Sequence, residues 1–194
     1  STHSIIDGSA NFVRMLKNEG FEIELLKDNR FSTGKATDEE EIKLLRGVAA
    51  VIAAGERYPA HVIKSLPDLR VIARFGVGFD KVDVKAATAN NVILTITPNS
   101  NYEAVAEHAI TLIMSFAKSI VGLDKAMRSG DWIMESLTPI RGTTLGIVGL
   151  GRIGRSLATR ARGMKMHVVA FEPNPDKKFV AENKIQLLDL VTLL

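Results

Sequence analysis

The chain has 194 residues, of which 46% are hydrophobic, 24% are charged and none is cysteine. The lack of cysteine excludes a disulfide framework, a cysteine-ligated zinc or iron–sulfur site and a thiol nucleophile. The formal net charge of +3 is too small to indicate a nucleic-acid partner, and the chain shows neither a long apolar run nor a secretory signal pattern, so we expect a cytoplasmic protein with no membrane partner.

The first half of the chain alternates short strands with helices. A strand is predicted over residues 21–26, where apolar and polar residues alternate, after a helix that begins by about Ser9. Thr37 and Glu40 form a capping box that opens a helix through Arg46, which Gly47 can end. Further predictions are strands over 48–53, 70–75 and 92–96 and helices over 60–65 and 82–89. This order is typical of βαβ units in a mostly parallel sheet that is covered on both faces.

Two segments have an organisation that the strand and helix alternation does not explain. Only Ile5 and Ile6 stand where a first strand is expected, so we expect that strand to be shortened by truncation or disorder. Residues 101–129 carry two apolar stripes at helical spacing, which predicts one long helix in a domain or subunit interface. Residues 129–142, which contain Trp132, are predicted to link two domains.

A glycine motif follows in the second half of the chain. A buried strand is predicted over 144–149, then the run Gly149-Leu150-Gly151-Arg152-Ile153-Gly154, a helix through Arg162 that stops at Gly163, and a second strand over 166–171. At such a strand-to-helix junction the first glycine allows the tight turn, the second lets a diphosphate approach, and the third lets helix and strand pack closely. The anion then lies on the N–H groups of the helix N-terminus, which predicts a dinucleotide site.

Glu172 follows the second strand, 18 residues after Gly154. A carboxylate there can accept hydrogen bonds from the adenosine ribose and would repel a 2′-phosphate, which favours NAD over NADP. Arg152 and Arg155 are near enough to the turn to give a positive field for the diphosphate. Arg160, Arg162 and Lys165 could contribute to the same field, but an equally good explanation for them is the favourable placement of cations near a helix C-terminus.

Three motifs together carry a family resemblance: residues 69–83 (LRVIARFGVGFDKVD), 97–107 (TPNSNYEAVAE) and 145–154 (LGIVGLGRIG). In this order they resemble the D-isomer-specific 2-hydroxyacid dehydrogenases, in particular those like phosphoglycerate dehydrogenase. The resemblance implies an α/β fold in which residues 1–98 form a flavodoxin-like substrate domain. Residues 99–194 would form a long interface helix and the first part of an incomplete Rossmann NAD-binding domain. The two apolar stripes of the 101–129 helix, in turn, lead us to expect a homodimer through that helix.

The resemblance assigns roles to particular residues. NAD would be bound by Gly149, Gly151, Arg152, Ile153, Gly154 and Glu172. The substrate would be bound by Val77, Gly78, Asn101 and Arg74, with helix capping as the alternative for Asn101 and pairing with an acid as the alternative for Arg74. A glycine-flanked turn after a strand can present N–H groups to a carboxylate, which agrees with the role of Val77 and Gly78. Glu107 and His108 are expected to be a structural pair, and no metal site is expected.

The family's catalytic arginine, glutamate and histidine would lie beyond residue 194, so we assign no catalytic residue and expect a polypeptide of about 310 to 340 residues. The implied activity is the NAD-dependent interconversion of a D-2-hydroxy acid and its 2-oxo acid, with D-3-phosphoglycerate as the candidate substrate. A glyoxylate or hydroxypyruvate reductase is the alternative, because Ala53 and Ala54 stand where an arginine often follows the strand. There are two further alternatives: a corepressor-like binding protein that has the same fold and responds to NAD, and a protein that binds a different nucleotide.

Overall fold

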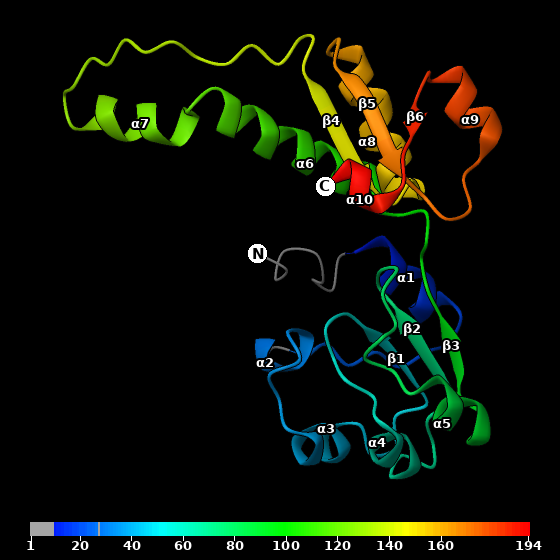
Figure 1. The fold of residues 1–194 in the computed structure, drawn as a ribbon. Coiled ribbons are helices and arrows are strands. Elements are labelled where there is room, and N and C mark those ends of the chain that lie inside the picture. The colour runs from blue at the N-terminus through cyan, green and yellow to red at the C-terminus, as the bar shows by residue number, and fades with distance from the viewer. Residues whose placement is uncertain (1–9, 27) are drawn as a thin grey trace. The chain divides into compact units, whose positions relative to one another are not determined.

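The computed structural model describes residues 10–26 and 28–194 (Figure 1). The chain divides into two compact units, residues 1–97 and residues 98–194. In the described residues, each unit contains a three-stranded parallel sheet with helices between its strands. The predicted α/β fold class is therefore confirmed.

The first unit is built on the sheet β1-β2-β3, in which all neighbours are parallel. Its strands are β1 (Ala50–Ala53), β2 (Val71–Arg74) and β3 (Ile93–Thr95). Its helices are α1 (Asn11–Asn18), α2 (Asn29–Ser32), α3 (Asp38–Leu44), α4 (Ala60–Lys64) and α5 (Val84–Ala89). Val62, Ile63 and Ile72 are fully buried where α4 and the sheet share the core of this unit.

The capping box at the start of α3 is present as predicted. Thr37 Oγ1 accepts a hydrogen bond from the Glu40 N–H at 3.2 Å, and the Glu40 carboxylate accepts one from the Thr37 N–H at 2.9 Å. The helix ends at Leu44, two residues earlier than Arg46, and Gly47 follows with a φ of +79°. A left-handed residue of this kind ends a helix, and glycine adopts it without a Cβ penalty.

The predicted strand over residues 21–26 is wrong, because this segment belongs to no strand or helix. A strand needs a neighbouring strand as hydrogen-bond partner for its backbone N–H and C=O groups. Within the described part of the chain, β1 pairs with β2 and β2 with β3, and none of these strands pairs with residues 21–26. Phe21 and Leu26 are about half exposed. The shortened first strand expected at Ile5 and Ile6 lies outside the described residues.

The second unit is built on the parallel sheet β4-β5-β6. Its strands are β4 (Thr144–Val148), β5 (His167–Phe171) and β6 (Gln186–Leu187). Its helices are α6 (Tyr102–Ala117), α7 (Ile120–Arg128), α8 (Arg152–Gly163), α9 (Lys177–Glu182) and α10 (Leu190–Leu193). β4 and β5 agree with the two predicted strands, and β6 is a third strand that the sequence analysis did not predict. The two residues of β6 are both exposed and form no apolar run, so the periodicity of the sequence does not reveal them.

The single long helix predicted over residues 101–129 is wrong, because α6 and α7 are separate helices whose axes differ by 60°. Ser119, between them, has a left-handed backbone with a φ of +45°, which ends the α-helical hydrogen-bond ladder. Lys118 donates a hydrogen bond to the Thr138 carbonyl at 2.8 Å and so ties the break to the segment after α7. Among the described residues no single helix is long and apolar enough to cross a membrane, although this bent pair passes the same test of length and composition.

The role predicted for residues 129–142 is also wrong. The division between the two units falls at Thr97 and Pro98. Residues 129–142 lie inside the second unit, between α7 and β4, and contain no helix or strand. Glycine and proline in a sequence indicate a loop, but they do not distinguish a loop within a unit from a link between two units.

Candidate functional site

The glycine turn joins β4 to α8 in the second unit. Gly149 has a φ of +97°, which only glycine adopts readily. A Cβ at Gly154 would overlap the carbonyl oxygen of Gly149 and lie 3.3 Å from Ile147 Cγ2. A Cβ at Gly151 would meet no described atom within 4 Å, so the outer side of the turn is open. The turn thus packs closely on the side of β4 and leaves its other side free for a ligand.

The N-terminus of α8 suits an anionic ligand. Its N-cap is Gly151, and the described residues supply no side-chain cap to this twelve-residue helix. The first N–H groups of a helix have no partner within the helix and carry its positive dipole end. With the open side of Gly151, these donors fit the diphosphate of a dinucleotide.

Glu172 lies beside the same turn. Its carboxylate accepts hydrogen bonds from the Leu150 N–H at 2.8 Å and from the Asn174 N–H at 3.1 Å. These backbone hydrogen bonds hold the pKa of Glu172 below its usual value, and the one from Asn174 has the larger effect. The structure therefore brings an anionic side chain to the glycine turn, and ribose binding by Glu172 stays a prediction.

The basic residues of α8 fall into two groups. Arg155 Nε donates to the Leu150 carbonyl at 3.0 Å, and its Nη1 lies 2.8 Å from Asp176 Oδ2. Arg160, in contrast, pairs with Glu103 and Glu107 of α6. The presence of a basic residue at position 160 is therefore explained by the contact between α6 and α8. The Glu107 carboxylate is 3.1 Å from Arg160, a contact that gives Glu107 a structural partner on α8, and the structural role expected for His108 stays a prediction.

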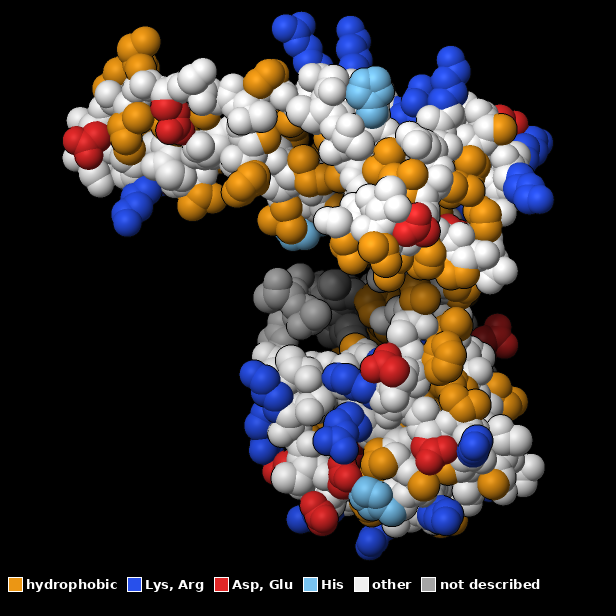
Figure 2. All heavy atoms as spheres, viewed as in Figure 1, with side chains coloured by type: hydrophobic (Ala, Val, Ile, Leu, Met, Phe, Trp, Pro, Cys, Tyr) orange, Lys and Arg blue, Asp and Glu red, His pale blue; other side chains and the backbone are white. Residues whose placement is uncertain are grey.

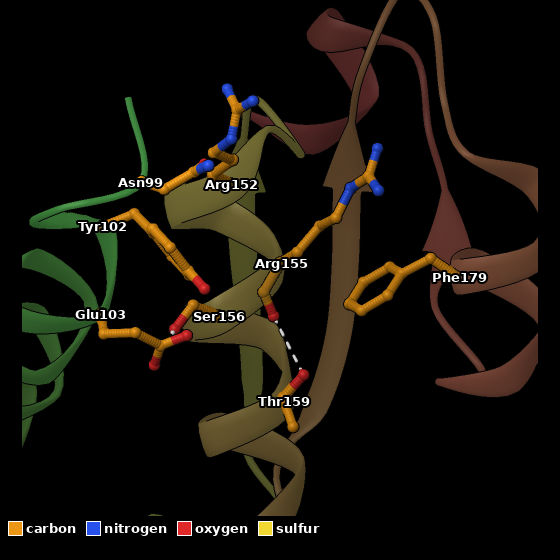
Figure 3. Close-up of a pocket in the computed structure, with 8 residues that line it drawn as sticks. All are labelled: Asn99, Tyr102, Glu103, Arg152, Arg155, Ser156, Thr159 and Phe179. Carbon is orange, nitrogen blue, oxygen red and sulfur yellow. Dashed lines mark hydrogen bonds between the residues drawn. The ribbon is translucent and has the colours of Figure 1, made fainter. Parts of the chain in front are cut away.

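A pocket of about 310 Å³ lies beside the start of α8 (Figure 3). Tyr102 and Glu103 of α6 line it together with Ser156 and Arg155 of α8. Ser156 donates a hydrogen bond to the Glu103 carboxylate at 3.0 Å. The polar wall between α6 and α8 is thus already hydrogen-bonded within the protein.

Three of the four predicted substrate residues lie in the first unit, at or after the end of β2. Arg74 is 8% exposed, and its guanidinium donates to the carbonyls of Gly78 and Glu56, each at 3.2 Å. By binding the Gly78 carbonyl, Arg74 holds the glycine loop. Val77 is 38% exposed on that loop. The loop can therefore present its N–H groups outward, and contact with a substrate stays a prediction.

Asn101, the fourth predicted substrate residue, lies in the second unit at the N-cap of α6. Its side chain makes no capping hydrogen bond with the described residues. The alternative interpretation of Asn101 as a side-chain cap is therefore wrong, and its contact with a substrate stays a prediction.

Sequence reasoning missed Asp176. Its carboxylate caps α9 by accepting hydrogen bonds from the N–H groups of Lys178 and Phe179, each at 3.1 Å, and also pairs with Arg155. An aspartate before a short helix is a recognised N-cap signal. The signal indicates the cap but not the arginine, which lies 21 residues earlier.

The chain is similar to known proteins over most of its length. The family model described as "D-isomer specific 2-hydroxyacid dehydrogenase, catalytic domain" matches residues 4–186. D-3-phosphoglycerate dehydrogenase of Archaeoglobus fulgidus is 31% identical over 188 residues, which are 96% of this chain and 34% of that protein. Glyoxylate reductase of Pyrococcus furiosus is 33% identical over 171 residues, 83% of this chain and 49% of that protein. The chain thus spans from about a third to about half of the length of these relatives.

Solved structures show the same fold. The TT0316 protein from Thermus thermophilus superposes with a TM-score of 0.81 at 29% identity, covering 94% of this chain and 57% of that one. The D-lactate dehydrogenase of Escherichia coli superposes with a TM-score of 0.76 at 28% identity, covering 93% of this chain and 56% of that one. Because the family model matches most of this chain, residues 4–186, the chain belongs to the D-isomer specific 2-hydroxyacid dehydrogenase family.

Proposed function

We propose that the protein is an NAD-dependent oxidoreductase that interconverts a D-2-hydroxy acid and its 2-oxo acid. The observation that carries this proposal is the glycine turn, open at Gly151 and closed at Gly154, with the Glu172 carboxylate hydrogen-bonded to its Leu150 N–H. The first N–H groups of α8 would bind the diphosphate, and Glu172 would bind the adenosine ribose. NAD would supply the hydride acceptor. The N–H groups of Val77 and Gly78 would bind the substrate carboxylate.

The relatives suggest two substrates. D-3-phosphoglycerate is the first candidate, since D-3-phosphoglycerate dehydrogenases cover up to 96% of this chain. A specific observation favours glyoxylate or hydroxypyruvate as the second. Ala53, at the end of β1, is 1% exposed and Ala54 follows it, so this position offers no cation for a phosphate group.

An assay of NADH oxidation by the purified full-length protein tests this proposal, with phosphohydroxypyruvate, hydroxypyruvate, glyoxylate and pyruvate as substrates. We expect turnover of at least one of them, with NADH preferred to NADPH. Glu172→Gln keeps an oxygen for the Leu150 N–H but removes the charge that repels a 2′-phosphate, so the preference for NADH should fall about tenfold. Binding of NADH without turnover of any 2-oxo acid would contradict the oxidoreductase and favour the binding protein.

We also propose that α6 and α7 form a homodimer interface. Phe116 is 89% exposed and Val121 is 76% exposed, and no residue of α7 is buried. Figure 2 shows hydrophobic side chains on the surface over these helices. An apolar face of this kind is typical of a self-complementary contact about a two-fold axis.

A charge placed on this face should disrupt the dimer. With Phe116→Asp and Val121→Asp combined, we expect the mass measured by sedimentation equilibrium to fall from that of a dimer to that of a monomer, because two buried carboxylates cannot be paired there. Lys85→Asp makes the same charge change on the exposed surface of α5, outside α6 and α7, and as the control it should leave a dimer. A wild-type protein that sediments as a monomer would refute the interface.

A further inference from the structure

Leu150, at the centre of the glycine turn, is fixed through both of its backbone polar groups. Its N–H donates to Glu172 at 2.8 Å, and its carbonyl accepts a hydrogen bond from Arg155 Nε at 3.0 Å. The Leu150 side chain is 1% exposed in the core of the second unit. The peptide groups on both sides of Leu150 therefore have one orientation, and that orientation depends on two charged side chains.

Arg155 also extends beyond the turn. Its Nη1 lies 2.8 Å from Asp176 Oδ2, and the guanidinium carbon lies 5.5 Å from the centre of the Phe179 ring. Figure 3 shows the side chain of Arg155 leaving α8 toward Phe179 of α9. Since Asp176 is the N-cap of α9, Arg155 joins the start of α8 to the start of α9.

The charges around Arg155 are consistent with a connecting role. Backbone hydrogen bonds contribute most to the lowered pKa values, that from Asn174 at Glu172 and that from Phe179 at Asp176, and the positive charge of Arg155 lowers both values further. Both carboxylates therefore stay ionised near neutral pH. The segment from Glu172 to Asp176 is held at one end by the Leu150 N–H and at the other by Arg155.

We propose that Arg155 is a positioning residue for the dinucleotide. Through Leu150 and Asp176 it holds the glycine turn and the segment after β5 in one arrangement, so that Glu172 and the N–H groups of α8 can bind two parts of the same ligand. It needs no contact with the ligand to do this. The inference rests on the proposed function and adds to it a residue that acts through its neighbours.

Arg155→Met removes the donors and keeps most of the apolar stem beside Phe179. We expect the dissociation constants for ADP-ribose and NADH, measured by titration of the purified protein, to rise about tenfold or more, because hydrogen bonds to charged groups are lost. The KM for NADH should rise similarly, while kcat at saturating NADH stays within about twofold. Arg162→Met, at the other end of α8, removes the same charge from a side chain without a partner among the described residues, and should leave both dissociation constants unchanged.

Two further variants separate positioning from folding. Arg155→Lys keeps the charge but cannot bind the Leu150 carbonyl and Asp176 together, so its affinity for ADP-ribose should be intermediate. Asp176→Asn keeps a capping oxygen for α9 and should weaken binding in the wild type but add little in Arg155→Met, since the two changes remove one interaction.

The outcomes distinguish this inference from the proposed function. A wild type that binds neither ADP-ribose nor NADH refutes the proposed function itself. If the wild type binds both ligands, and Arg155→Met or Arg155→Lys is folded by circular dichroism and binds them with dissociation constants within about twofold of the wild-type values, the role of Arg155 alone is overturned. Full additivity of Arg155→Met and Asp176→Asn would also overturn it.

Discussion

Gly154→Ala is expected to lower the free energy of unfolding of the second unit by about 2 to 4 kcal/mol and to abolish dinucleotide binding. The new Cβ would overlap the Gly149 carbonyl and press on Ile147 Cγ2. Because these atoms belong to the turn and to β4, α8 would have to move away from the sheet. That movement would displace the N–H groups that we assign to the diphosphate. Thermal or urea unfolding and titration with NADH measure the two effects.

Gly163→Ala is the matched control for Gly154→Ala, on the same helix. Gly163 is the last residue of α8, and a Cβ there would meet no described atom within 4 Å. Since alanine favours a helix more than glycine does, this variant should be as stable as the wild type or more stable by about 0.5 to 1 kcal/mol. Equal losses in the two variants would contradict the argument from close packing.

Glu41 is expected to make the first unit less stable as the pH rises. Glu41 is 4% exposed, and its Oε1 has no hydrogen-bond partner among the described residues. Burial has the largest effect on the pKa of Glu41 and, with the negative charges of Glu56 and Asp38, raises it to about 7. A hydrogen bond with Tyr58 and the positive charge of Arg57 lower this pKa, but by less. In the unfolded chain the pKa returns to near 4.5. Between these two values the folded state binds more protons, so the free energy of unfolding falls with rising pH, by at most about 3 kcal/mol.

The buried carboxyl of Glu56 acts in the same direction, because burial also raises its pKa. Glu41→Gln cannot ionise, so its stability should change less between pH 4.5 and pH 7, and above pH 7 it should exceed that of the wild type. Urea unfolding at a series of pH values measures this difference. Glu39→Gln, on the exposed surface of the same α3, is the control and should keep the wild-type profile. A wild-type stability that is constant from pH 5 to pH 8 would show that Glu41 does not titrate as its burial implies.

Local signals in the sequence were sufficient for the features that depend on nearby residues. The capping box of Thr37 and Glu40 spans three residues, and the tight turn at Gly149 depends on backbone sterics that only glycine relieves. Glu172 also follows its strand at the expected place. The family of the chain was recognised from such short motifs, because close packing and anion binding restrict which residues can occupy a turn.

Other features depend on partners far away in the sequence. Residues 21–26 alternate as a strand does but have no neighbour to pair with, and the apolar stripes of 101–129 continue through Ser119, where the backbone is left-handed. The pairing of Arg155 with Asp176 depends on how α8 and α9 pack. In the sequence by itself, apolar periodicity determined the fold class, and the glycine motif and its spacing determined the glycine turn and its acidic neighbour. Only the tertiary structure decided which strands pair, where the helix breaks and which charges meet, because strand pairing, packing and charge contacts are made between segments that the chain brings together only on folding.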